Sequence, residues 1–185
     1  MTSVRFYDDD LTDLGLSIFL AGPTARHART AWRIEAMQVP FEGAWIVPEF
    51  RSESFDVAAP RRFARAASPA PGMRPISYSI LEWETTGIER ATVVLFWMPF
   101  AITHEDDPAS LPGFTTRAEV SREIVRAPDR IVLGMPEGAL SGSHIRYHAH
   151  RAGARIHATL AATVTAAIDL ARSRKAVFDQ EVPCS

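Results

Sequence analysis

The chain has 185 residues, of which 46% are hydrophobic, and its 20 basic and 22 acidic side chains give a formal net charge of −2. This length suits a single domain that buries about 70% of the surface of its unfolded chain. The near-neutral balance argues against a nucleic-acid polymer as partner, because polynucleotide binding needs a broad positive field.

The amino terminus and the cysteine content favour a cytoplasmic protein. Four aspartates among residues 8–13 stand where a signal peptide would be basic and then apolar. No apolar run approaches the ~20 residues of a membrane span, so we expect no membrane partner. Cys184 is the only cysteine, which leaves no disulfide framework and no thiolate metal cluster.

Short runs rich in β-branched and aromatic residues predict the strands. Their apolar character is nearly continuous, as it is in strands that helices cover on both faces. In chain order, the runs are residues 16–21, 44–47, 91–97, 130–135 and, more weakly, 155–158.

Helical patterns lie between these runs. They cover residues 29–38, 76–88, 116–126, 143–151 and 158–172. This alternation predicts an α/β fold: a single-domain, flavodoxin-like or Rossmann-like parallel sheet of about five strands with helices on both faces. We assign residues 1–172 to this domain and residues 173–185, which lack a pattern, to a C-terminal tail.

Two long connections interrupt the alternation. Residues 51–75 hold four prolines and five arginines, and residues 99–114 lead directly to Thr115. A connection of this length in a compact domain is usually functional or mobile. For residues 51–75, a substrate lid and a solvated surface loop are both open interpretations.

Glu84 lies on the apolar side of a predicted helix. On a helical wheel of residues 76–88, its i, i+4 neighbours are Ile80 and Ile88. Its carboxylate should therefore face the protein or a cleft, where an unpaired charge is costly. Two interpretations remain open: a structural Glu that pairs with an Arg or caps a backbone group, and a functional carboxylate.

Glu119 follows the predicted strand of residues 91–97 and its loop. Open α/β sheets bind ligands at the carboxyl edge of their strands, so Glu119 is a candidate catalytic carboxylate. Residues 116–119 also match a Thr-x-x-Glu capping box, and spacing alone favours this capping role. The two roles are compatible, because a helix amino terminus keeps a carboxylate ionised.

The loop after the first strand carries Gly22 and Pro23, and a glycine there lets the backbone approach a sugar or phosphate. The three-glycine dinucleotide fingerprint and the Walker-type loop are both absent from the sequence, so neither NAD nor ATP is expected. His144 and His148 have i, i+4 spacing, but no acidic or Cys partner is placed to complete a metal site. We expect no metal and no cofactor.

Several short motifs follow one another in chain order over about residues 16–136. They are Ile18-Phe19-Leu20-Ala21-Gly22-Pro23-Thr24, Trp32-Arg33-Ile34-Glu35-Ala36, Val47-Pro48-Glu49, Trp83-Glu84, Leu95-Phe96-Trp97-Met98-Pro99, Thr115-Thr116-Arg117-Ala118-Glu119 and Leu133-Gly134-Met135-Pro136. No single motif is specific. With the ordered set, however, the chain resembles the nucleoside 2-deoxyribosyltransferase-like family.

The resemblance implies a flavodoxin-like homo-oligomer that cleaves the N-glycosidic bond of a small-molecule nucleoside or nucleotide. It implies that Glu119 is the nucleophile, that Glu84 binds and orients the substrate, and that Gly22 and Pro23 line the pocket. The resulting hypothesis is a glycosyl ester on Glu119, from which the sugar passes to another base or to water.

Three more residues are candidate substrate contacts. Trp97 or Phe114 could stack on the base, although an aromatic residue at a strand end more often belongs to the core. Arg117 could meet a phosphate, although arginines near helix starts are more often solvated or salt-bridged.

The chain departs from the family pattern at three points. Ser121 stands where the family commonly has glycine, Gly113 stands where well-studied transferases have an acid, and the sequence contains no asparagine. These departures favour an alternative, a non-catalytic nucleotide-binding or sensor domain of the same fold. The presence of both Glu84 and Glu119 favours the enzyme.

Overall fold

The computed structural model describes residues 2–7, 9–23, 32–49, 78–99, 113–139 and 142–181. The predictions on residues 51–75, and on the loop after Pro99 as far as residue 112, lie outside the described residues.

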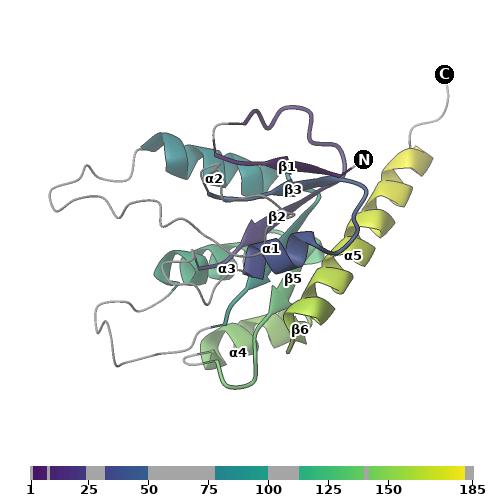
Figure 1. The fold of residues 1–185 in the computed structure, drawn as a ribbon. Coiled ribbons are helices and arrows are strands. Elements are labelled where there is room, and N and C mark those ends of the chain that lie inside the picture. The colour runs from purple at the N-terminus through teal and green to yellow at the C-terminus, as the bar shows by residue number, and fades with distance from the viewer. Residues whose placement is uncertain are drawn as a thin grey trace, which may run out of the picture.

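The described residues form an α/β domain around one parallel sheet (Figure 1). The strands are β1 (Ser3–Arg5), β2 (Ser17–Ala21), β3 (Ala44–Ile46), β4 (Val93–Trp97), β5 (Ile131–Gly134) and β6 (Ile156–His157). They lie in the order β1-β3-β2-β4-β5-β6, and every neighbouring pair is parallel. The predicted fold class is confirmed, with six strands instead of about five.

The additional strand is β1, at the edge of the sheet beside β3. It has three residues, and none of them is fully buried. A strand so short and so exposed carries no continuous apolar run, which is the signal that identified β2 to β5.

Helices cover both faces of the sheet, as predicted (Figure 1). α1 (Trp32–Met37) and α5 (Leu160–Glu181) pack on one face, and α2 (Tyr78–Arg90), α3 (Phe114–Arg126) and α4 (Ser143–Arg151) pack on the other. A short 3₁₀ helix, η2 (Pro128–Arg130), precedes β5. None of the helices in the described ranges is long and apolar enough to cross a membrane.

The last helix is longer than predicted. α5 continues to Glu181 and so includes most of the segment that was assigned to a tail. Its carboxyl-terminal third lies beyond the apolar stripe of Leu160, Val164 and Ile168 that packs on the sheet. The absence of periodicity after residue 172 therefore reflects loss of contact with the core rather than the end of the helix.

The strand order fixes where the loops of the sheet diverge. Without β1, the order is that of a flavodoxin-like sheet, and its topological switch point lies between β2 and β4. From β2 the chain crosses to β3 through α1 on one face, and from β3 it reaches β4 through α2 on the other. The loops after β2 and β4 thus separate at the carboxyl edge, where such folds bind ligands.

A glycine holds α2 close to the sheet. A Cβ atom on Gly87 would lie 2.7 Å from the Phe19 ring, nearer than a side chain can approach. Because Gly87 follows Glu84 by about one helical turn, this close packing sets the height of Glu84 above the sheet.

We expect Gly87→Ala to lower the free energy of unfolding by about 1–3 kcal/mol, because the overpacked Phe19 ring must move. This loss outweighs the gain of up to about 1 kcal/mol in helix propensity. Urea denaturation measures the change. Gly138→Ala is the control, because a Cβ there has nothing within 4 Å, and equal stability of the two variants would contradict the packing argument.

Candidate active site

Gly22, which follows β2, and Trp97, the last residue of β4, lie next to each other at the switch point. A Cβ atom on Gly22 would lie 2.6 Å from the Trp97 carbonyl oxygen and 2.7 Å from the Trp32 ring. There is therefore no room for a side chain at this position, which requires glycine. The Gly22 carbonyl oxygen accepts a hydrogen bond from Arg33. The Trp97 side chain is only 7% exposed and belongs to the core, so its stacking on a substrate base stays a prediction.

Arg33 is a cation buried at this edge. Its side chain is 1% exposed, although it belongs to the short helix α1. Its Nε donates to the Leu20 carbonyl oxygen at 3.1 Å, its Nη2 donates to the Gly22 carbonyl oxygen at 2.7 Å, and its Nη1 pairs with the Glu49 carboxylate. One guanidinium thus joins the ends of β2 and β3.

Tyr7 holds Glu84 in place. The Tyr7 hydroxyl donates a hydrogen bond of 2.5 Å to Glu84 Oε1, and the Tyr7 ring packs edge-on against Trp83 with 5.0 Å between ring centroids. Trp83 in turn donates from Nε1 to the Asp9 carbonyl oxygen. Burial and then the Glu84 carboxylate raise the pKa of Tyr7, so the phenol keeps its proton for this bond.

Glu119 is not part of a capping box. α3 begins at Phe114, its N-cap is Gly113, and the N-cap makes no side-chain hydrogen bond. Gly113 has a left-handed backbone with φ of 91°, which starts the helix before Thr116, so that Thr116 lies inside the first turn. The prediction of a capping box formed by Thr116 and Glu119 is therefore wrong.

The Glu119 carboxylate shares the electrostatic environment of Glu84 and Arg33. Burial and then the negative charge of Glu84 raise the pKa of Glu119 to about 7, although Arg122 and Arg33 act in the opposite direction. The same Glu84 charge acts on Arg33, whose pKa is lowered by burial and raised by Glu49 and Glu84. The two acids that the sequence singled out, from α2 and α3, thus lie close enough to repel each other.

The remaining predicted site residues are Pro23, Arg117 and Phe114, and each has a different environment. The Pro23 carbonyl oxygen accepts a hydrogen bond of 3.3 Å from Trp32 Nε1, so this residue contributes its backbone to the loop after β2. Arg117 is partly buried in the first turns of α3. Phe114 is the first residue of α3, and its side chain lies outside the described part of the structure.

His144, His148 and His150 lie on α4, on the same face of the sheet as α2 and α3. His144 Nε2 and His148 Nε2 are 3.2 Å apart on the exposed side of the helix. Within the described ranges, no three or more His, Cys, Asp or Glu side chains form a group that could hold a metal ion.

Three polar residues of this edge were missed as site residues: Tyr7, Arg33 and Glu49. Tyr7 follows β1 and Glu49 follows β3, so recognising β1 as a strand would have placed both at the carboxyl edge. The Tyr7 backbone N–H donates to the Glu49 carbonyl oxygen at 3.1 Å. For Arg33, the usable signal was a lone charge between Trp32 and Ile34, both of which are buried.

No protein-family model matches the chain, and no curated protein sequence matches it. The residues of the site and their geometry are therefore the basis for inferring a function.

We expect Glu119→Gln to raise the free energy of unfolding at about pH 8, by about 1–3 kcal/mol, because it removes a partly buried charge near Glu84. The folded-state pKa is raised, so the native state holds a proton that the unfolded state has lost between about pH 4.5 and 7. The wild type therefore loses stability across this range as pH rises, and the variant does not.

Chemical denaturation of both proteins at about pH 5 and pH 8 measures the difference. Glu82→Gln is the matched control, because Glu82 is an exposed carboxylate on α2. A gain in stability that is equal at both pH values would contradict a raised pKa of Glu119.

Proposed function

We propose that this protein cleaves the N-glycosidic bond of a (deoxy)nucleoside or nucleotide through a covalent glycosyl-Glu119 intermediate. The sugar then passes to another base or to water, so that the protein acts as a deoxyribosyltransferase or an N-glycosidase. We also propose that it is related to the nucleoside 2-deoxyribosyltransferase-like family, on the ordered motifs between residues 16 and 136.

One observation carries the proposal: two carboxylates from separate helices are electrostatically coupled at the carboxyl edge of a flavodoxin-like sheet. Glu84 comes from α2 and Glu119 from α3, and the charge of the first raises the pKa of the second. Two carboxyl groups that share one site are the usual means of glycoside cleavage, with one as nucleophile and the other assisting.

Glu119 loses its proton as pH rises through about 7, and the ionised form is the one that can act as a nucleophile. In its ionised form, one carboxylate oxygen attacks the anomeric carbon as the carbon–nitrogen bond breaks, and the electron pair of that bond leaves with the base. The base takes up a proton, and the sugar remains as an ester on Glu119. Attack on this ester by a second base, or by water, regenerates the carboxylate.

Glu84 is the partner that orients the substrate. The Tyr7 hydroxyl bonds Glu84 Oε1, and this contact fixes the orientation of the carboxylate group and therefore the position of Oε2. An acceptor of this kind suits the hydroxyl groups of a sugar, and it can also orient a water molecule that donates a proton to the departing base. Arg33 is a positioning residue, because it reaches the site through the Gly22 backbone and the Glu49 carboxylate.

A second candidate function is a non-catalytic nucleotide-binding or sensor domain with the same pocket. The absence of asparagine, together with Gly113 and Ser121 at family positions, favours it. In either case we propose a small-molecule nucleoside or nucleotide as the ligand, a homo-oligomer as the assembly and a cytoplasmic location.

The deciding experiment incubates the protein with deoxynucleosides, nucleosides and their monophosphates, with and without an acceptor base, and measures released or exchanged base. We expect Glu119→Gln to lower kcat by about 10³-fold or more, because it removes the nucleophile. We expect Glu84→Gln to lower kcat/KM by about 100-fold.

Glu82→Gln, which changes an exposed carboxylate of the same helix as Glu84, should match the wild type. Release without an acceptor indicates a hydrolase, and exchange alone indicates a transferase. Nucleotide binding without turnover on any substrate would support the sensor domain, and equal activity of Glu119→Gln and wild type would refute the mechanism.

The activity should also depend on pH in one direction. With its pKa at about 7, Glu119 gains its negative charge as pH rises through neutrality, so kcat/KM should increase between about pH 5.5 and 8.5. Initial rates at low substrate concentration measure the profile. A kcat/KM that falls across this range would contradict Glu119 as the nucleophile and indicate that it acts as a proton donor.

A further inference from the structure

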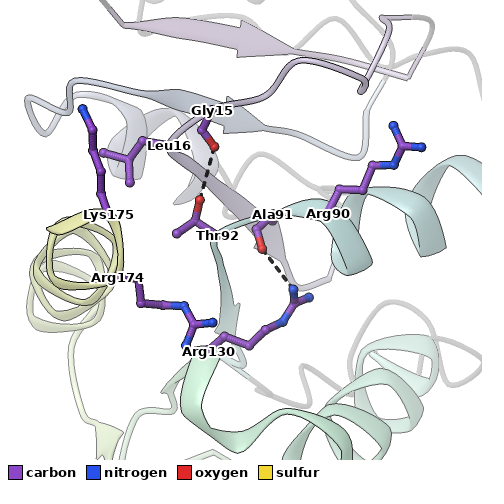
Figure 2. A pocket seen from close by; sticks show the side chains of 8 residues that line it. All are labelled: Gly15, Leu16, Arg90, Ala91, Thr92, Arg130, Arg174 and Lys175. Atoms are coloured by element: carbon purple, nitrogen blue, oxygen red, sulfur yellow. Dashed lines mark hydrogen bonds between the residues drawn. The ribbon is translucent and has the colours of Figure 1, made fainter. Parts of the chain in front are cut away.

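A concave site lies at the opposite edge of the sheet from Glu84 and Glu119. It is a hollow of about 460 Å³ at the amino ends of β2 and β4, between the last turn of α2 and the carboxyl-terminal third of α5 (Figure 2). Leu16 and Ala91 give it a small apolar wall, and the Gly15–Thr92 hydrogen bond of 3.3 Å closes the space between the strands.

Four of the eight lining residues are cations, and none of the eight is acidic. They are Arg90, Arg130, Arg174 and Lys175. The chain as a whole has a formal charge of −2, so this concentration of positive charge is local. In Figure 2 the Arg174 side chain extends toward Arg130, and Lys175 and Arg90 lie at the two sides of the hollow.

Backbone and side-chain contacts fix three of these cations. Arg90 Nη1 donates to the Leu11 carbonyl oxygen at 3.2 Å. Arg130 Nη1 donates to the Glu89 carbonyl oxygen at 2.9 Å and to the Ala91 carbonyl oxygen at 3.1 Å, which holds it against the end of α2. Arg174 Nη1 donates to Asp129 Oδ2 at 2.6 Å. Their positions are set by these contacts, and a ligand would not have to order them.

The cations are only partly neutralised. Burial lowers the pKa of Arg130, and the nearby positive charges of Arg126 and Arg174 lower it further, although Glu123 opposes them. The Lys175 side chain makes no hydrogen bond or ion pair with any residue in the described ranges. Like charges held together in a concave site are relieved by an anion that bonds to several of them.

We propose that this hollow binds the phosphate or diphosphate group of a small phosphorylated molecule. A phosphate group matches the site better than a carboxylate does, because it carries more charge and offers more acceptor oxygens to guanidinium groups. Arg174, whose side chain extends toward Arg130 in Figure 2, makes the principal contact, and the exposed Lys175 side chain turns toward the ligand to make the second. Arg130 and Arg90 add positive potential. The remaining volume accommodates the rest of a small ligand beside Leu16.

The test uses inorganic pyrophosphate as the probe and isothermal titration calorimetry of the full chain at constant ionic strength. We expect Lys175→Gln and Arg174→Gln each to weaken pyrophosphate binding by about tenfold, since each removes one charge-assisted contact. Lys175→Gln is the cleaner variant, because Arg174 also holds Asp129.

Arg172→Gln is the matched control, because Arg172 is an exposed residue of α5 that does not line the hollow and its loss changes the net charge equally. Weaker binding in the two lining variants with unchanged binding in Arg172→Gln supports the proposal. Absence of pyrophosphate binding, or equal weakening in all three variants, overturns it. Binding of pyrophosphate by Glu119→Gln at wild-type affinity is expected, because this site is separate from the carboxyl edge.

Discussion

The buried guanidinium of Arg33 is the interaction on which the carboxyl edge depends. Removal of this cation from water is unfavourable. Hydrogen bonds to the Leu20 and Gly22 carbonyl oxygens and the pair with the Glu49 carboxylate offset this desolvation. These acceptors come from the ends of β2 and β3, two neighbouring strands. Arg33 therefore acts by position: it holds the backbone after β2 and the Glu49 carboxylate after β3 in fixed places at the carboxyl edge.

The two candidate carboxylates at this edge, Glu84 and Glu119, have different environments. Glu84 is bonded by a phenol that keeps its proton, whereas burial and the charge of Glu84 raise the pKa of Glu119 to about 7. Two chemically identical side chains thus have different surroundings: the Tyr7 hydroxyl bonds Glu84, whereas burial and the Glu84 charge act on Glu119.

The extent to which sequence predicts this structure follows the strength of the physical signal. β2 to β5 are continuous apolar runs because helices cover both of their faces, and they were identified. β1 is short and partly exposed, so it was missed, and Tyr7 was missed with it. Glu84 was predicted to face the protein or a cleft because its apolar neighbours on the helix are visible in the sequence, and its carboxylate is partly buried in the structure.

For Glu119, the residue spacing predicted a capping box with Thr116. In the structure the N-cap of α3 is Gly113, which has a left-handed backbone, and this conformation cannot be inferred from spacing. The Arg33–Glu49 pair could not be predicted either, because a contact between residues 16 positions apart depends on how β2 and β3 are brought together.

Three contacts hold α2 at different points along its axis. Arg130 bonds the carbonyl oxygens of its last turn, Gly87 is pressed against the Phe19 ring, and Tyr7 bonds Glu84, about 9 Å along the helix axis from Arg90. These contacts hold the two halves of α2 separately. Loss of the Arg130 contacts would therefore release the last turn of α2, while the Tyr7 bond would still hold Glu84.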